Sequence, residues 1–509
     1  MAQFEEVSQK SKLHPKPEGL ALQYGTAGFR THAKHLDHIM FRMGLLATLR
    51  SKKTKSTIGV MVTASHNPEE DNGVKLTDPM GEMVTAVWEG YATQLANAEQ
   101  DSLLKELKDI IEKEDIDMSE PASIYVGKDT RPSGASLSRA VLDGVSSLGG
   151  KTHDYGLVTT PQLHYMVCCC NTHGCYGSPT VEGYYQKLSQ AFLQLTQNAS
   201  NRTDDQKRLL VDGANGIGAL KMREMEPFLR SKLQVVLSND SSSGKLNHMC
   251  GADYVKVQQK APQGMNMGVG ERCCSFDGDA DRIVYYYTDS KGCFHLLDGD
   301  KIATLISILL LVKRLFIVQM SSANFSPSDN NSTLFFAGML QVLFSKAAQK
   351  QIQELVKDPN TNDERKRAVK LLESTINLIN QTVGDAILDM LVIEAVLAIR
   401  GMSVQDWHAI YTDLPNRQLK VTVSDRRVID TTDAERRAVT PEGLQDAIDS
   451  LVKKYKTARS FVRPSGTEDV VRVYAEADTQ ENADRLAHEV SLAVYRLAGG
   501  VGDEPKPLH

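Results

Sequence analysis

Short runs rich in β-branched residues alternate with helix-like segments through much of this chain. Residues 56–63 (STIGVMVT) and 123–127 (SIYVG) predict buried strands, whereas 35–50 and 134–148 carry apolar residues at helical spacing. A second unit of the same kind occupies 208–287. Strands that alternate with helices favour a layered α/β fold with a mainly parallel sheet. With 509 residues, the chain is long enough for three or four domains.

The C-terminal part of the chain has a different pattern. Residues 417–424 alternate polar and apolar side chains, and 460–463 and 469–476 predict two further strands around a polar turn. Helices are predicted at 442–455 and 482–497. Alternation of this kind is typical of an antiparallel sheet with one solvated face. The C-terminal region is therefore predicted to be a compact α+β module.

The overall composition is that of an ordinary globular protein, with 41% hydrophobic and 24% charged residues. The net charge of −6 argues against bulk binding of nucleic acid, which usually requires a basic surface. The most apolar run, 302–312, meets Lys313 and Arg314 before it reaches the ~20 residues of a membrane span. We therefore predict a buried helix there and expect neither a nucleic-acid nor a membrane partner.

The eight cysteines include two runs of direct neighbours, 168–170 and 273–274. Neighbouring cysteines do not suit a disulfide framework, and no C-x-x-C pair suggests zinc. Residues 1–16 are polar and lack the apolar core of a signal peptide. Free thiols in a reducing compartment are thus predicted, which indicates a cytoplasmic protein.

Three aspartates, Asp277, Asp279 and Asp281, alternate with small residues in the segment that closes the second unit. Carboxylates about 5 Å apart repel by roughly 3 kcal/mol per pair at an effective dielectric of 20, so this arrangement calls for a cation. Oxygen ligands favour Mg²⁺ or Ca²⁺ over zinc, and Arg282 stands where an EF-hand loop would need further ligands. We predict a Mg²⁺ site, and the alternative is an acidic surface turn.

A serine motif, TASHNP, directly follows the first predicted strand, and the segment DNGVK comes soon after it. Chemistry in α/β folds is placed at strand ends. We therefore expect Ser65 on an exposed turn with His66 beside it, and Lys75 ten residues further along. An ordinary polar turn that ends in Asn-Pro is the other interpretation.

A turn between the two C-terminal strands has the sequence Arg463-Pro-Ser-Gly-Thr467, and Arg472 follows on the next strand. Guanidinium groups, hydroxyls and the backbone N–H groups that glycine leaves accessible are the donors that a phosphate needs. A plain β-hairpin turn is also consistent, but it does not explain why Arg463, Ser465 and Thr467 gather there.

Weaker glycine-rich or polar motifs occur at 25–30 (GTAGFR), 127–131 (GKDTR), 159–162 (TTPQ) and 212–218 (DGANGIG). The last of these lacks both the G-x-G-x-x-G spacing and a Walker lysine, so no nucleotide site is predicted. A serine, a Mg²⁺ triad and a separate phosphate loop, each on a different α/β unit, together indicate phosphoryl transfer without a nucleotide.

The motifs T-A-S-H-N-P, D-G-D-A-D-R and R-P-S-G-T occur in this order and resemble those of the α-D-phosphohexomutase superfamily. The resemblance covers residues 22 to about 310, and then about 342 to 502. It implies three similar α/β domains, the third truncated or altered, and a smaller C-terminal α+β domain around a central cleft. The implied domains are 1–180, 181–299, 300–400 and 401–509.

The resemblance also implies roles for individual residues. Ser65 matches the phosphoserine, whose phosphoryl group passes to a sugar phosphate and is replaced after the bisphosphate reorients. Lys75 matches a proposed general acid or base. The reacting site is expected to contain Ser65, His66, Lys75 and Arg282. The Mg²⁺ ligands are expected to be Ser65, Asp277, Asp279 and Asp281. The clamp on the non-reacting phosphate is expected to be Arg463, Ser465, Gly466, Thr467 and Arg472.

The alanine before Ser65 and the extent of the match favour the branch of the superfamily that acts on N-acetylglucosamine phosphates. This implies interconversion of the 6-phosphate and the 1-phosphate on the route to UDP-N-acetylglucosamine. The implied partner is a small sugar phosphate, bound by a monomer or weak dimer. A phosphoglucomutase or phosphomannomutase with the same chemistry is the alternative.

One departure from the family falls in the expected third domain. The family's sugar-binding loop, of the type G-E-A-N-G, has no counterpart in 314–340, where Ser322-Ala-Asn-Phe lacks the glutamate and the glycines. An altered splice product, a mis-joined gene model or a divergent domain would each produce this pattern. Loss of hydrogen bonds to sugar hydroxyls can cost orders of magnitude in rate, so we expect weak activity or a non-catalytic chain.

Overall fold

The computed structural model forms two compact units, Met1–His408 and Ala409–His509. The described residues are 2–25, 27–199, 203–318, 354, 363–380, 383–412, 414–433, 435–465 and 469–506. Most of the segment in which the sugar-binding loop is missing, from residue 319 onward, lies outside the described residues, as do Gly466 and Thr467. None of the helices in the described part is both long and apolar enough to cross a bilayer.

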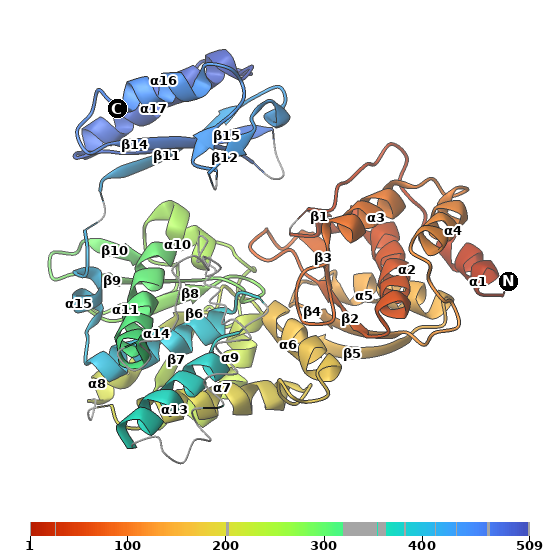
Figure 1. Ribbon diagram of the computed structural model, residues 1–509, viewed down its shortest axis with the longest axis horizontal. Helices are drawn as coiled ribbons and strands as arrows, with labels where there is room; N and C mark the ends of the chain where they lie inside the picture. Colours follow the sequence, from red (N-terminus) through yellow and green to blue (C-terminus); the bar gives the residue numbers. More distant parts are fainter. Residues whose placement is uncertain are drawn as a thin grey trace. The chain divides into compact units, whose positions relative to one another are not determined.

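A five-stranded sheet lies at the centre of the N-terminal part of the first unit (Figure 1). Its strands are β1 (Phe29–His32), β2 (Thr57–Val62), β3 (Asp71–Thr77), β4 (Ser123–Lys128) and β5 (Lys151–Leu157), in the order β1-β3-β2-β4-β5. The predicted parallel pairing holds for β2, β4 and β5. In contrast, β3 pairs antiparallel with both β2 and β1, so the sheet is mixed. This mixed topology corrects the expectation of a mainly parallel sheet.

Helices cover this sheet on both faces. They are α1 (Ala2–Ser11), α2 (Asp37–Thr54), α3 (Ala86–Asn97), α4 (Leu103–Lys113), α5 (Gly134–Ser147) and α6 (Thr160–Asn171). The core side chains Ile58, Val60 and Val62 of β2 pack with α2 and α5, whereas the Cβ position of Gly59 faces Val167 of α6. Successive side chains of β2 point to opposite faces of the sheet, and helices cover both faces, so the whole strand is buried.

A second five-stranded sheet follows in the chain (Figure 1). Its strands are β6 (Arg208–Asp212), β7 (Gln234–Ser238), β8 (Cys273–Phe276), β9 (Ile283–Thr288) and β10 (Phe294–Leu297), in the order β10-β9-β8-β6-β7. Strands β7, β6 and β8 are parallel, while β8, β9 and β10 form antiparallel hairpins. The three aspartates occupy the tight loop between β8 and β9.

Helices pack around the second sheet and extend into the region predicted as the third domain. They are α7 (Val181–Thr196), α8 (Asp204–Lys207), α9 (Ile217–Leu229), α10 (Ala252–Gln258), α11 (Gly299–Val318), α13 (Asp363–Leu378), α14 (Ala386–Arg400) and α15 (Val404–His408). Helix α14 is almost completely buried, and its N-cap Asp385 accepts a hydrogen bond from the backbone N–H of Leu388 at 3.1 Å.

The second unit is the predicted α+β module. Its principal strands are β11 (Asn416–Thr422), β14 (Arg459–Pro464) and β15 (Val470–Glu476), in the antiparallel order β11-β15-β14. A short ladder joins β12 (Thr431–Thr432) and β13 (Arg437–Ala438). Helices α16 (Leu444–Val452) and α17 (Gln480–Leu497) contribute side chains to a core that also includes Val462 and Val473. The predicted antiparallel sheet is thus confirmed.

Candidate active site

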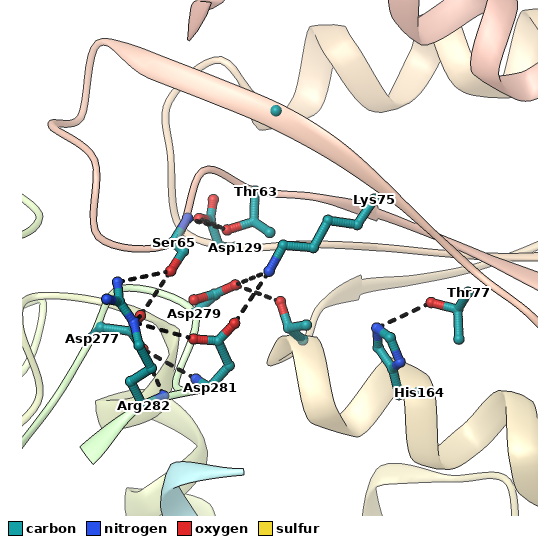
Figure 2. Close-up of polar contacts among 12 residues, drawn as sticks. Thr63, Ser65, Lys75, Thr77, Asp129, His164, Asp277, Asp279, Asp281 and Arg282 are labelled. Carbon is teal, nitrogen blue, oxygen red and sulfur yellow. Dashed lines mark hydrogen bonds and ion pairs between the residues drawn. The ribbon is translucent and has the colours of Figure 1, made fainter. Parts of the chain in front are cut away.

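Two loops from the two large sheets meet in the first unit (Figure 2). We call residues 63–70, between β2 and β3, the serine loop, and residues 277–282, between β8 and β9, the aspartate loop. The Oγ of Ser65 donates a hydrogen bond of 2.8 Å to Oδ2 of Asp277, although the two residues are 212 positions apart. Ser65 lies on the predicted turn but is only 1% exposed, so the expectation of an exposed serine is wrong. The aspartate loop and Asn247, which both follow strands of the second sheet, contact it.

The three predicted aspartates form a buried cluster. Asp277, Asp279 and Asp281 each offer an oxygen within 4.8 Å of the other two. Burial, together with the charges of Asp281 and Asp279, raises the pKa of Asp277 to about 8. Oδ1 of Asp279 is buried and accepts no hydrogen bond from any residue that the structure describes. Crowded carboxylates with an unused oxygen fit a hard divalent cation such as Mg²⁺.

Two cations face the triad (Figure 2). Nζ of Lys75 lies 3.4 Å from Asp279 and 3.2 Å from Asp281, and Nε of Arg282 lies 3.0 Å from Asp277. Arg282 also donates a hydrogen bond of 3.3 Å to Oγ of Ser65. Burial alone would lower the pKa of Lys75, but the two carboxylates outweigh it and raise the pKa. Lys75 is therefore held as a cation beside Asp279 and Asp281.

The N-termini of two helices donate hydrogen bonds to the aspartate loop. Thr160, at the start of α6, donates a side-chain hydrogen bond of 2.6 Å to Oδ2 of Asp279 and a backbone one of 3.2 Å to its carbonyl. The N–H of Ala386, at the start of α14, donates to the carbonyl of Ala280 at 3.0 Å. These contacts place the loop at the partly positive ends of two helices, which favours the carboxylates.

A glycine permits the close approach of the two loops. A Cβ atom at Gly278 would lie 2.5 Å from the carbonyl oxygen of Ser65, closer than real side chains come. Ser65 itself has a left-handed backbone with φ of +52°. The D-G-D spacing therefore provides two of the carboxylates that could hold a cation and also leaves the space that Ser65 needs.

His66 lies at the edge of this cluster and is half-buried. Burial and the charge of Arg282 lower the pKa of His66 to about 4, so the imidazole is neutral at physiological pH. Arg30, from the weaker motif at 25–30, adds a positive charge that acts on both His66 and Asp279. The structure thus brings together every residue predicted for the reacting site.

The predicted phosphate loop belongs to the second unit. Arg463 on β14 stands directly opposite Arg472 on β15. The N–H of Ser465 donates to the carbonyl of Val470 at 2.8 Å, which closes the hairpin, and Arg463 forms an ion pair with Glu435. Like charges directly opposite each other destabilise a sheet, so a bound anion would stabilise this pair beyond what Glu435 provides. The hairpin therefore fits the binding of a phosphate.

Sequence reasoning missed three residues that contact these loops. Thr160 and Arg131 lie in motifs that were too weak to interpret, and Asn247 carried no signal at all. Arg131 and Asn247 each donate a 2.9 Å hydrogen bond to the carbonyl of Ser65. Such backbone contacts depend on the path of the folded chain, and no residue pattern encodes them.

Comparison with known proteins identifies the family. The phosphoacetylglucosamine mutase of Homo sapiens is 59% identical to this chain, with 98% of this chain and 99% of the relative aligned. The chain belongs to the phosphoacetylglucosamine mutase family. Family models for phosphoacetylglucosamine mutase AMG1 match domain II at 178–284 and domain III at 335–402. Phosphoglucomutase/phosphomannomutase models match α/β/α domain I at 45–101 and 102–175, and the C-terminal domain at 419–493.

Solved structures of phosphoacetylglucosamine mutases share the fold. An N-acetylglucosamine-phosphate mutase of the α-D-phosphohexomutase superfamily, captured with product, is 41% identical, with a TM-score of 0.89 over 96% of this chain and 99% of that one. The Aspergillus fumigatus enzyme, solved with GlcNAc-6P and magnesium, is 40% identical, with a TM-score of 0.89 over 98% and 99%. The predicted superfamily and α/β fold class are therefore confirmed.

The phosphoacetylglucosamine mutase of Homo sapiens is longer than this chain within the aligned region. The alignment spans 539 positions, whereas this chain has 509 residues, so at least 30 positions of the relative have no counterpart here. This difference is consistent with the shortening that the sequence indicates near 314–340.

Proposed function

We propose that this chain is a Mg²⁺-dependent phosphosugar mutase that interconverts N-acetylglucosamine 6-phosphate and N-acetylglucosamine 1-phosphate, on the route to UDP-N-acetylglucosamine. The observation that carries this proposal is the buried contact of 2.8 Å between the hydroxyl of Ser65 and a carboxylate of the aspartate triad. Membership of the phosphoacetylglucosamine mutase family supports the substrate, because a relative has been solved with GlcNAc-6P and magnesium.

In this proposal Ser65 carries the phosphoryl group. In the first transfer the bond from Ser65 Oγ to phosphorus breaks, and a bond forms between phosphorus and a sugar hydroxyl oxygen. The bisphosphate then reorients, and the second transfer returns its other phosphoryl group to Ser65. Arg282 already donates a hydrogen bond to Oγ, so it is placed to stabilise negative charge on that oxygen.

The triad would hold Mg²⁺ through Asp277, Asp279 and Asp281, with an oxygen on Ser65 completing the ligand set. A bound Mg²⁺ would neutralise charge on the phosphoryl group during transfer. Each transfer also removes a proton from the attacking hydroxyl and delivers one to the leaving oxygen. We assign this exchange to Lys75, whose ammonium lies 3.2 Å from Asp281. Lys75 would first give its proton to the leaving oxygen and then, as a neutral amine, accept the proton of the attacking hydroxyl, which restores the ammonium. Neutral His66 lines the same site.

The phosphate that does not react requires a second binding site. We propose Arg463, Ser465 and Arg472 for this role, together with Gly466 and Thr467, which lie outside the described residues. The paired arginines on β14 and β15 support it, since two guanidinium groups can hold one phosphate through several charged hydrogen bonds.

The proposal is tested by measuring turnover of the purified chain. N-acetylglucosamine 6-phosphate is supplied with Mg²⁺ and a trace of the bisphosphate, and release of the 1-phosphate is followed. We expect turnover that Ser65→Ala reduces by at least about a thousandfold, because the phosphoryl group then has no carrier. Ser136→Ala, at an exposed serine of α5, serves as the control.

Three outcomes would overturn the proposal or change its substrate. Undiminished turnover in Ser65→Ala would remove the serine from the mechanism. Faster turnover of glucose or mannose phosphates would favour the phosphoglucomutase or phosphomannomutase alternative. A folded chain that turns over no sugar phosphate would be the non-catalytic variant.

We also propose a cytoplasmic location and a monomeric or weakly dimeric state. All eight cysteines are free in the structure, as expected in a reducing compartment. Cell fractionation tests the location and light scattering tests the oligomeric state. Secretion, or a stable oligomer larger than a dimer, would contradict these two proposals.

A further inference from the structure

The serine loop adopts a conformation that needs external support. Ser65 has φ of +52°, a left-handed conformation that costs a non-glycine residue about 1–2 kcal/mol. The carbonyl groups of Ser65, Asn67 and Pro68 each accept a hydrogen bond from a side chain outside the loop, and Pro68 also accepts one from the N–H of Asp71 at 3.1 Å. Buried carbonyls of this kind need hydrogen-bond donors from elsewhere in the protein.

Arg131 supplies most of these donors. Its Nη2 donates to the carbonyls of Ser65 and Asn67, both at 2.9 Å. Its Nη1 donates to the carbonyls of Pro68 and Asp71, the latter at 2.7 Å. Four carbonyls of one short segment are thus held by a single buried guanidinium, a geometry that only the planar fork of arginine provides.

Asp129, which pairs with Arg131, is linked through Thr63 to the N–H of Ser65. Nε of Arg131 donates to Oδ2 of Asp129 at 3.0 Å, and the hydroxyl of Thr63 donates to the same oxygen at 2.7 Å. The hydroxyl oxygen of Thr63 in turn accepts a hydrogen bond of 3.0 Å from the N–H of Ser65. Both backbone polar groups of Ser65 are therefore tied to the Asp129–Arg131 pair.

Asn247 holds the same carbonyls from the side of the second sheet. It lies in the loop between β7 and α10, and its Nδ2 donates to the carbonyls of Ser65 at 2.9 Å and Asn67 at 3.0 Å. Its own N–H donates to the carbonyl of Ala214 at 2.9 Å, which anchors it to the turn after β6. The carbonyl of Ser65 thus receives one hydrogen bond from the loop that follows β4 and one from the loop that follows β7.

We propose that Arg131 and Asn247 are positioning residues for the phosphoryl-carrying serine. Together they fix Ser65 in the left-handed conformation that directs its Oγ at Asp277, and neither contacts the reacting atoms. The second donor, Asn247, makes the alignment of the serine depend on the docking of the second sheet. The inference rests on the proposed function and adds to it two residues that govern the transfer step.

The test uses the full chain with substitutions at Asn247, which is only partly buried. Asn247→Asp keeps the shape but places an acceptor against two carbonyl oxygens, and Asn247→Ala removes the donor. We expect both variants to lower kcat by roughly 10–100-fold with KM changed by less than about threefold, because a misdirected nucleophile slows transfer more than binding. Arg131→Lys should lower kcat further.

A matched control comes from the same loop. Lys245 pairs with Glu70 across the two loops at 3.5 Å, but it does not contact the carbonyl of Ser65. Lys245→Met should keep the kcat and the melting temperature of the parent. A kcat in Asn247→Asp equal to that of the parent, or an equal loss in Lys245→Met, would overturn the inference while parental turnover still supports the proposed function.

Hydrogen exchange tests the positioning role of Asn247 without any measurement of enzymatic turnover. Backbone amides in the peptide that covers 63–71 should exchange faster in Asn247→Asp than in the parent or in Lys245→Met. Unchanged exchange in Asn247→Asp would overturn the positioning role even if the parent turned over no sugar phosphate. Absence of parental turnover would refute the proposed function alone.

Discussion

Asp279 has a carboxylate oxygen that no described residue satisfies, and it lies beside two further carboxylates. We expect Asp279→Asn to weaken Mg²⁺ binding by roughly 10–100-fold or more, because a neutral amide gives up both charge and a ligand oxygen. Mg²⁺ titration followed by calorimetry measures the change, and zinc should substitute poorly in the parent.

A nearby carboxylate outside the triad provides the control for this prediction. Asp253 lies 3.6 Å from Arg282 and is 48% exposed at its side chain. Asp253→Asn should bind Mg²⁺ within about threefold of the parent, since it removes a similar charge from the surroundings but no ligand. Equal losses of Mg²⁺ affinity in the two variants would mean that the triad acts through its negative charge alone and does not coordinate the ion.

The protonation of Asp385 is expected to make the free energy of unfolding depend on pH. Tyr184 donates hydrogen bonds to both of its oxygens, at 2.9 and 2.8 Å, yet burial raises the pKa of Asp385 from 3.8 to about 6. Because the folded state binds this proton more tightly, the stabilisation is complete below about pH 4 and lost as the pH rises through 6. Asp385→Asn keeps the helix cap but does not ionise.

We therefore expect Asp385→Asn to gain about 1–1.5 kcal/mol of stability relative to the parent between pH 5 and pH 8. Urea unfolding of both proteins at each pH measures the difference in the free energy of unfolding. A difference that stays constant across this range would show that Asp385 does not hold a proton in the folded protein.

At the scale of elements, two glycines allow α2 and α5 to cross in close contact. A Cβ at Gly144 would lie 2.0 Å from the carbonyl oxygen of Phe41, and one at Gly44 would lie 2.2 Å from that of Val141. Gly144→Ala should therefore destabilise the protein by about 1–3 kcal/mol, since backbone must move to admit the methyl group. The midpoint of urea unfolding reports this loss.

Gly90 offers the matched control, because it lies in α3 with nothing within 4 Å of its Cβ position. Gly90→Ala should be neutral or stabilise by about 0.5–1 kcal/mol, as alanine does in an open helical site. Destabilisation of the same size in both variants would contradict the close crossing of α2 and α5.

Element prediction from the sequence succeeded where apolar periodicity is strong and failed at polar strands. Strand β2 and helix α5 follow their predicted bounds closely, because one face or both faces of each are apolar. Strand β3 (DNGVKLT) was not predicted as a strand, because its buried positions include Asn72 and Lys75. Partners far away in the sequence satisfy them, namely Ser133 for Asn72 and the triad for Lys75.

The candidate active site likewise contains residues that the sequence could indicate and residues that it could not. The sequence could indicate Ser65 and the three aspartates as candidates, because their dense polar motifs directly follow apolar strands. The supports Arg131, Asn247 and Thr160 could not be predicted, because their partners are mostly backbone carbonyls or side chains more than 60 residues away. The burial of Ser65 was missed for the same reason, since it depends on the docking of the second sheet.

At the scale of the whole molecule, the proposed reacting residues lie in the first unit and the proposed phosphate loop in the second. Between the two in the chain lies the region around 314–340, where the sequence lacks the family's sugar-binding loop. A sugar ring that is held only at its phosphates would have no fixed orientation when the bisphosphate rotates between the two transfers. We therefore expect the loop to affect the rate more than the affinity for phosphate.

Restoring the segment tests this expectation. A version of the chain that carries the corresponding segment of the Homo sapiens relative should show at least about tenfold higher kcat, because hydrogen bonds to the sugar hydroxyls are regained. We also expect a higher melting temperature. Equal kcat in the two versions would show that this chain turns over its substrate without the loop.

The central claim is that Ser65 carries an exchangeable phosphoryl group next to the aspartate triad. Its most direct test is to load the chain with a radioactive phosphoryl group from a labelled N-acetylglucosamine bisphosphate, map the label by peptide mass analysis, and chase it with unlabelled 6-phosphate. The account predicts label on the peptide that contains Ser65, released at least as fast as kcat. Label on another residue, or label on Ser65 that the chase leaves in place, would contradict it.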